Sequence, residues 1–110
     1  MGMIGDVKDK NVMLVDDMLD TGGTIVHAAN YLKEQGAKSI RVIVTHGLFS
    51  GDALQNISHS AIDEVIVTDT IVQRDDVKNN KKIKIVSVAP LLAEAILRIK
   101  SGESLSSLFL

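Results

Sequence analysis

The chain has 110 residues, enough for one ordinary domain with a single core, and its net charge is −2, with lysines and acids mixed along the sequence. Hydrophobic residues make up 45% and charged residues 24%, which is typical of a globular rather than a disordered chain. There is no basic stripe, no cysteine and no apolar run of about 18 residues, which argues against nucleic acid binding, disulfides, thiolate metal sites and a membrane span. We expect a cytoplasmic protein.

The first strand and helix are predicted from apolar periodicity. The run at residues 11–15 predicts a strand that is covered on both faces, as in a parallel sheet. A helix is predicted from Thr24 to Gln35, because apolar residues recur there at i, i+3, i+4 and i+7 and Gly36 supplies a stop. Residues 39–45 predict a second strand, and the loop after it leads into a short helix with Ser50 as its N-cap.

The second half of the chain continues this alternation. Residues 64–68 predict a third strand, and the polar run 73–82 predicts an exposed connection. A fourth strand is predicted over 83–88, at a sheet edge because Lys84 interrupts its apolar residues. Pro90 marks the first turn of a last helix, whose apolar stripe is expected to form core or subunit contacts; the stripe consists of Leu92, Ala95, Ile96 and Ile99.

Strands and helices therefore alternate along the chain. This order predicts an α/β fold with a parallel sheet, right-handed crossovers and helices on both faces, in a single domain over residues 1–110. The tail at residues 103–110 is expected to dock. The opening Met1-Gly2-Met3 looks like a start codon joined to an internal segment, so we expect a fragment of a longer protein.

The most informative stretch joins the first strand to the first helix, at residues 16–24. In open α/β sheets, ligands bind where strands end. The first amides of a helix have no partners within it and lie at its positive end, so they suit a phosphate that glycines allow to approach closely. We expect a phosphate on the amides of residues 20–24, with Thr21 and Thr24 adding hydroxyl donors.

The carboxylates of this stretch need another partner, because an acid repels a phosphate. Ionised carboxylates accept hydrogen bonds, so Asp16 and Asp17 suit the vicinal hydroxyls of a ribose, and they also suit hydrated Mg²⁺. A sugar phosphate satisfies both halves of the stretch; the alternative is a strand–helix turn in which the acids and glycines serve geometry alone. Walker and dinucleotide loops are excluded, since no lysine follows the glycines and these form only an adjacent pair. The predicted ligand-binding residues are Asp16, Asp17, Asp20, Thr21, Gly22, Gly23 and Thr24.

Other stretches point to one family. Leu14 to Thr24 matches the ribose-phosphate loop shared with type I phosphoribosyltransferases. Over nearly its whole length, from Ile4 to Phe109, the chain resembles the C-terminal part of the ribose-phosphate pyrophosphokinase (phosphoribosyl pyrophosphate synthetase) family. The further stretches that carry this resemblance are residues 5–8, 45–53, 67–71, 93–96 and 103–109.

The resemblance implies a partial phosphoribosyltransferase-like, Rossmann-like domain. It implies transfer of diphosphate from ATP to the C1 hydroxyl of ribose 5-phosphate with Mg²⁺, in a full-length parent that forms a homo-oligomer. It also implies that Asp16 and residues 20–24 bind ribose 5-phosphate. The family's ATP site, metal ligands and basic loops precede the residue matching Ile4, so no catalytic residue is expected in this chain and the fragment alone is expected to be inactive.

Two alternative functions share the loop. A nucleobase phosphoribosyltransferase would need a base-binding hood and a complete pyrophosphate loop, and neither can be placed here. A non-catalytic regulatory homologue typically loses or interrupts the acidic loop, which this chain keeps. Near the C-terminus, Ser104, Ser106 and Phe109 match positions that bind a regulatory phosphate or ADP in some family members, and equally suit a packed tail with serines capping a turn.

The roles of two residues outside this stretch are left undecided by the sequence. His46 closes the second strand at the ligand-bearing edge, where a rim histidine with a local hydrogen bond is favoured over a ligand-binding one. Asp69 ends the third strand on the same edge and suits either metal or nucleotide binding or the capping of a turn.

Overall fold

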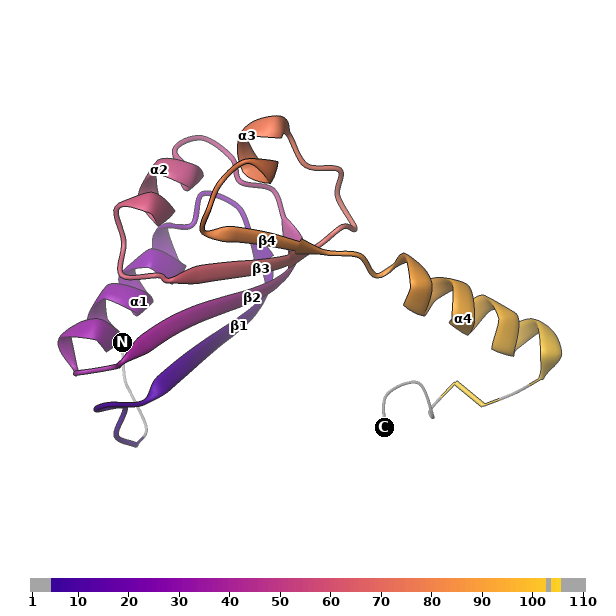
Figure 1. Ribbon diagram of the computed structural model, residues 1–110, viewed down its shortest axis with the longest axis horizontal. Coiled ribbons are helices and arrows are strands. Elements are labelled where there is room, and N and C mark those ends of the chain that lie inside the picture. The colour runs from indigo at the N-terminus through magenta and orange to yellow at the C-terminus, as the bar shows by residue number, and fades with distance from the viewer. Residues whose placement is uncertain (1–4, 103, 106–110) are drawn as a thin grey trace.

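The computed structural model describes residues 5–102 and 104–105, which form four strands and four helices (Figure 1). The parallel sheet is confirmed, and its strands stand in the order β1-β2-β3-β4. The strands are β1 (Asn11–Leu19), β2 (Ser39–Gly47), β3 (Glu64–Thr68) and β4 (Ile83–Val86), and the helices are α1 (Gly23–Glu34), α2 (Ala53–Ser58), α3 (Asp75–Lys78) and α4 (Ala89–Ser101).

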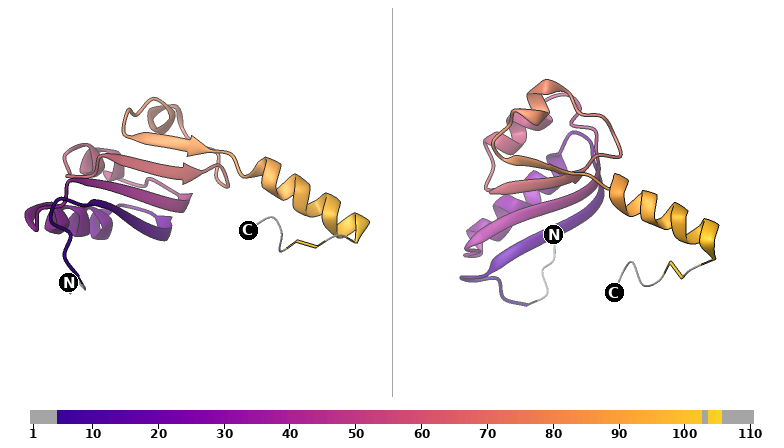
Figure 2. Two further views of the ribbon diagram at one scale, coloured as in Figure 1. Left: turned by 60° about the horizontal axis from the view of Figure 1, so that its bottom comes forward. Right: turned by 45° about the vertical axis from the view of Figure 1, so that its right-hand side comes forward.

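The strand order leaves one face of the sheet uncovered. Right-handed crossovers between strands added in one direction place every crossover helix on the same face. Side chains alternate accordingly along β2, where Val42 and Val44 are fully buried under the helices while Arg41 and Thr45 are exposed. The expectation of helices on both faces is therefore wrong for α1, α2 and α3 (Figures 1 and 2). We call the other side the open face; its residues are Met13, Val15, Asp17, Arg41, Ile43, Thr45, Glu64, Ile66, Thr68, Lys84 and Val86.

The first strand also differs from its prediction. β1 continues to Leu19, beyond the predicted end at residue 15, and it is an edge strand with one covered face instead of two. Asp16 and Asp17 therefore sit within a strand that pairs with β2 as far as Leu19 and Gly47, whereas Asp20 follows that strand. β4 occupies the other edge, as Lys84 had indicated.

The polar run at residues 73–82 was predicted to be exposed, and this is wrong in part. Residues 75–78 form the short helix α3, and Val77 is fully buried in the core. Gln73 is buried as well, and its side-chain amide donates a hydrogen bond of 2.8 Å to the carbonyl of Gly47. The buried amide is tolerated because it has this partner. The segment between β3 and β4 thereby holds the carboxyl end of β2 in place.

The last helix, α4, projects away from the sheet (Figures 1 and 2). It begins at Ala89 with Pro90 in its first turn, as predicted, and Gly102 ends it in the left-handed conformation. None of its thirteen residues is buried. Within residues 5–102, no helix is long and apolar enough to cross a membrane.

Candidate functional site

A cleft lies where β1 gives way to α1. It has a volume of about 260 Å³ and is lined by nine residues of a single stretch. Six of the seven residues predicted from the sequence are among them. The lining consists of Asp16, Met18, Leu19, Asp20, Thr21, Gly22, Gly23, Thr24 and Ile25.

The start of α1 presents unpaired backbone amides at this cleft. The first hydrogen bond of the helix runs from the amide of Val26 to the carbonyl of Gly22 at 2.9 Å, so the amides of the three preceding residues have no acceptor within the helix. No acidic residue lies in the first turn to offset the positive end of the helix dipole. Gly22 caps the helix with a φ of 80°, a left-handed conformation that favours glycine.

The carbonyls of the loop are tied to the segment that follows β2. The carbonyl of Leu19 accepts from the amide of Leu48 at 2.8 Å, and that of Asp20 accepts from the amide of Ser50 at 2.9 Å. The side-chain amide of Asn56 reaches the carbonyl of Thr21 at 3.4 Å. These backbone carbonyls already accept hydrogen bonds from the segment behind the loop. The carboxylates, hydroxyls and unpaired amides of the loop therefore remain for a ligand.

The two neighbouring aspartates lie on different sides of β1. Asp16 lines the cleft, and one of its carboxylate oxygens accepts a hydrogen bond of 2.8 Å from the amide of Asp17. Asp17 does not line the cleft, because strand alternation places it on the open face. The geometry therefore gathers Asp16 and Asp20 with the glycines and threonines, and leaves Asp17 outside.

A metal ion has limited support from this chain alone. Among residues 5–102, 104 and 105, no three histidine, cysteine or acidic side chains come together in a way that could hold one. Asp16 and Asp20 supply oxygens of the kind that Mg²⁺ prefers, and Mg²⁺ commonly takes one or two carboxylates together with substrate phosphates. The donor set thus fits an ion that arrives with its substrate.

Two residues left open by the sequence have local partners. Nδ1 of His46 lies 2.7 Å from the hydroxyl of Thr70, and His46 does not line the cleft, which agrees with a rim histidine. One carboxylate oxygen of Asp69 accepts from the amide of Val88 at 2.9 Å. Hydrogen bonds from the Ser87 side chain and the Val88 amide hold the pKa of Asp69 below its ordinary value of 3.8. Asp69 therefore fixes the connection between β4 and α4.

The C-terminal positions are only partly described. Ser104 is exposed, and its carbonyl accepts a hydrogen bond of 3.1 Å from Nη1 of Arg98. Ser106 and Phe109 lie outside the described residues. The suggested regulatory site and the docking of the tail therefore stay predictions.

The sequence did not indicate which apolar residues line the cleft or which residues support the loop from behind. Met18, Leu19 and Ile25 line it, although they read as ordinary strand and helix residues. Asn56 was not singled out either, and nothing in its local sequence marks a contact with Thr21, 35 positions earlier. Such contacts depend on how β2 and α2 pack against the loop.

Comparison with known proteins gives consistent results. The model of the phosphoribosyl synthetase-associated domain matches residues 1–110. Ribose-phosphate pyrophosphokinase from Haemophilus ducreyi is 49% identical over 109 residues, covering 99% of this chain and 34% of the relative. The protein of that name from Campylobacter jejuni is 51% identical over 110 residues, covering 100% of this chain and 35% of the relative. The chain thus spans about a third of the length of these relatives.

A solved structure shows the same arrangement. The crystal structure of phosphoribosylpyrophosphate synthetase from Mycobacterium smegmatis matches with a TM-score of 0.83 at 43% sequence identity. The match covers 90% of this chain and 33% of that chain. It confirms the α/β fold read from the sequence.

Proposed function

The chain belongs to the phosphoribosyl synthetase-associated domain family, and from that premise we propose that it is the ribose 5-phosphate-binding portion of a ribose-phosphate diphosphokinase. In the full-length parent, diphosphate would pass from ATP to C1 of ribose 5-phosphate. The relatives' shared name, ribose-phosphate pyrophosphokinase, favours this activity over a nucleobase phosphoribosyltransferase or a regulatory homologue.

The observation that carries the proposal is the two-part lining of the cleft. Free amides at the positive end of α1 suit a phosphate, and the carboxylates of Asp16 and Asp20 suit sugar hydroxyls. The volume of 260 Å³ lies below the roughly 300–1,000 Å³ of sites for drug-sized ligands. The cleft therefore suits one sugar phosphate better than a whole nucleotide.

The chain by itself is proposed to bind without turning over. Diphosphoryl transfer depends on positioning and on cations that neutralise developing charge. The cleft lining contains no lysine, arginine or histidine. Mg²⁺ and ATP would be held largely by other parts of the parent, which we propose to be a cytoplasmic homo-oligomer. The proposed regulatory phosphate or ADP site at Ser104, Ser106 and Phe109 belongs to that assembly.

The place of this chain within its parent is also part of the proposal. The closing stretch 103–109 resembles the end of the family's sequence, which supports the C-terminal third. Reading the encoding gene tests this: an in-frame sequence upstream of Met1 supports it. A reading frame that continues well past Leu110 contradicts it and assigns the chain to an earlier part of the parent.

Ligand binding is tested by following amide NMR shifts during a titration with ribose 5-phosphate. Shifts are expected at Asp16 and at residues 18–25, together with weakening of at least about tenfold in Asp16→Asn, Asp20→Ala and Gly23→Val. Asp75→Asn is the matched control, because Asp75 lies on α3 and does not line the cleft. Inorganic phosphate and ribose should each bind more weakly than the joined molecule.

Two results would contradict the proposal. One is the absence of shifts in the cleft up to about 10 mM ribose 5-phosphate, a concentration that detects even millimolar affinity. The other is consumption of ATP by the chain alone in the presence of ribose 5-phosphate and Mg²⁺. Base-dependent release of pyrophosphate would favour the phosphoribosyltransferase alternative.

A further inference from the structure

The loop of the cleft rests on residues 47–50 at and after the end of β2, which we call the supporting segment. The amide of Leu48 donates to the carbonyl of Leu19 at 2.8 Å, and the amide of Ser50 donates to the carbonyl of Asp20 at 2.9 Å. Leu19 and Asp20 both line the cleft. The position of the Asp20 carboxylate therefore depends on the position of the supporting segment.

The supporting segment contains a residue in an unusual conformation. Phe49 has a φ of 49°, in the left-handed region that few residues with a side chain adopt. Its side chain is fully buried in the core, and its amide also donates to the carbonyl of Leu19, at 3.3 Å. A conformation of this kind persists only where the surroundings hold it in place. The shape of the segment is therefore set by its contacts.

Two neighbouring side chains supply contacts on the other side of the segment. The side-chain amide of Gln73 donates to the carbonyl of Gly47 at 2.8 Å. Nη2 of Arg74 donates to the carbonyl of Phe49 at 2.9 Å, and Nη1 makes a longer contact of 3.5 Å with the carbonyl of Leu48. Three successive carbonyls thus face side-chain donors, while the amides of the same segment hold the cleft loop.

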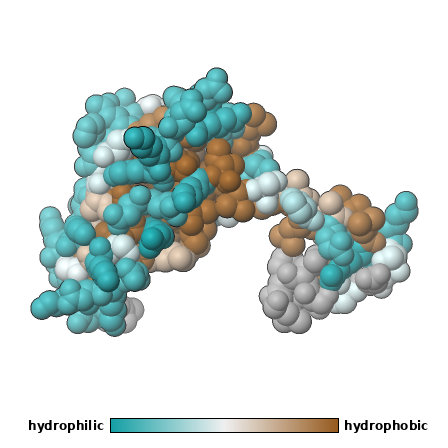
Figure 3. Space-filling model, in the orientation of Figure 1, coloured by the Kyte–Doolittle hydropathy of each residue, from teal (hydrophilic) through white to brown (hydrophobic). Residues whose placement is uncertain are grey.

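These two side chains are themselves well anchored. Beyond the end of β3 the chain turns back to α3 (Figure 1), which Val77 fixes to the core because its side chain is fully buried. The surface over α3 is hydrophilic in Figure 3. There Nε of Arg74 donates to the carboxylate of Asp76 at 3.1 Å, which orients the guanidinium group. Gln73 is buried, so its amide has little freedom to turn elsewhere.

We propose that Gln73 and Arg74 are positioning residues, which set the shape of the cleft by holding the supporting segment. Neither residue lines the cleft, so each acts only through backbone that lies between. The identity of the ligand rests on the proposed function, whereas the support of the loop rests on the hydrogen bonds alone. The unpaired amides at the start of α1 have a separate support, because α1 packs on the sheet through Ala29 and Leu32. Loss of the contacts should therefore disturb the carboxylate side of the cleft more than its phosphate side.

The first experiment needs no ligand and measures amide hydrogen exchange by NMR in the natural chain and in Arg74→Met. The exchange of the Leu48 and Ser50 amides should become at least about tenfold faster, because the segment opens more often. Amides in the middle of β2, at Val42 and Val44, should keep their rates, which separates a local effect from a loss of global stability.

Arg41→Met is the matched control for this experiment. The side chains of Arg41 and Arg74 are 46% and 53% exposed, and each is paired with one acidic residue. The guanidinium group of Arg41 contacts Ser39 and Glu64 instead of the supporting segment. Removal of the same charge there should leave the exchange of the Leu48 and Ser50 amides within about twofold of the natural rates.

The second experiment compares two ligands. Arg74→Met should raise the dissociation constant of ribose 5-phosphate at least about fivefold and that of inorganic phosphate by less than about twofold. Arg74→Lys keeps a charged donor and should regain part of the affinity for ribose 5-phosphate. Gln73→Glu has nearly the same volume but no donor for the carbonyl of Gly47, so it should act like Arg74→Met. Thermal unfolding identifies the temperature at which every variant is folded.

The two experiments separate this proposal from the proposed function. Unchanged exchange at Leu48 and Ser50 in Arg74→Met overturns the positioning role, whatever the ligands do. Equal weakening of ribose 5-phosphate and inorganic phosphate overturns it as well, since that would be a general effect on the fold. If the natural chain does not bind ribose 5-phosphate, the proposed function fails, and the exchange rates alone decide whether Arg74 positions the loop.

Discussion

Single residues decide how tightly the end of β2 is packed behind the cleft. A Cβ atom built on Gly47 would lie 2.8 Å from Cγ2 of Val67 and closer still to the ring of Phe49, and both of these neighbours are fully buried. The carbonyl of Gly47 is also held by buried Gln73. Neither neighbour has room to withdraw, so this position needs glycine for space.

Gly47→Ala is accordingly expected to destabilise the chain by about 1–3 kcal/mol, the usual cost of overpacking a core. Urea unfolding followed by circular dichroism measures this difference. Gly23→Ala is the control, since a Cβ at Gly23 meets nothing within 4 Å and alanine favours a helix. Equal stability of Gly47→Ala and the natural chain would show that the Phe49 ring moves aside freely.

The carboxylate of Asp69 is stabilised in its charged form by the Ser87 side chain and the Val88 amide. Its pKa is lowered, so the charged form contributes stability at pH values above the ordinary 3.8. This contribution is lost as the pH falls through the lowered pKa. NMR titration of the Asp69 carboxyl carbon should give a midpoint below 3.8, with the Val88 amide shift following it. Asp69→Asn should abolish the titration at Val88, and a midpoint at or above 3.8 would contradict the contact.

At the scale of elements, a side chain from a distant part of the sequence caps the end of the short helix α2. The ammonium group of Lys82 donates to the carbonyls of Ile57, Ser58 and Ser60, at 3.1, 3.3 and 3.2 Å. These carbonyls lie at and beyond the end of α2, where a helix presents its negative pole. A helix of six residues has little stability of its own, so it depends on such contacts.

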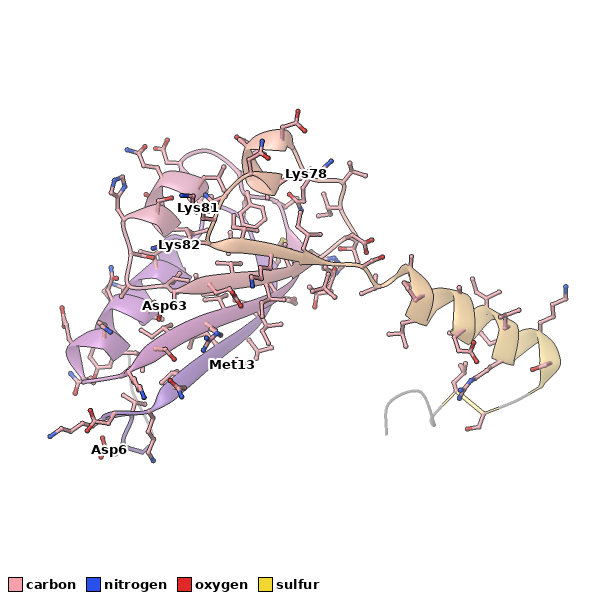
Figure 4. The ribbon with its side chains drawn as sticks, viewed as in Figure 1. Asp6, Met13, Asp63, Lys78, Lys81 and Lys82 are labelled. Atoms are coloured by element: carbon pink, nitrogen blue, oxygen red, sulfur yellow. The ribbon has the colours of Figure 1, made fainter. Side chains whose placement is uncertain are left out.

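Lys82→Met keeps much of the side-chain volume and removes these hydrogen bonds. It is expected to lower the free energy of unfolding by about 1–2 kcal/mol, in line with charge-assisted hydrogen bonds that are partly exposed. Thermal unfolding of both chains measures the change. Its neighbour Lys81 (Figure 4) is exposed, so Lys81→Met should leave stability within about 0.5 kcal/mol, and a similar loss in both variants would point to net charge instead.

At the scale of the whole molecule, the chain is extended. Its radius of gyration is 16.4 Å, whereas a compact domain of this length would have about 13 Å. The difference arises from α4, which makes the longest dimension 51 Å against 21 Å for the shortest. The core is formed by the sheet, by α1, α2 and α3 and by the connecting residues Ala37, Phe49 and Ile62, and it includes no residue of α4.

A chain that ends at Val88 is therefore expected to keep its fold. Its melting temperature at low concentration should stay within a few degrees of that of the full chain, because the missing helix buries nothing in the core. Small-angle scattering should give a radius of gyration near about 12 Å. A large fall in melting temperature would mean that α4 supports its own sheet.

The sequence predicted most of this architecture. Parallel strands and the positions of α1 and α4 follow from apolar periodicity, and six of the seven residues predicted to bind a ligand line the cleft. The face that Asp17 occupies was missed because β1 was expected to end before it. The exposure of β1 and the burial of Gln73 depend on strand order and packing, which short-range patterns do not encode.

The direction of α4 depends on the contacts that Asp69 makes with the β4–α4 link. The helix extends about 20 Å beyond Val88, so a rotation of about 10° at that residue would displace its far end by about 3.5 Å. A displacement of that size exceeds what closely packed side chains accommodate without losing contact. One carboxylate, through its hydrogen bonds with Ser87 and Val88, thereby fixes the direction in which α4 leaves the sheet.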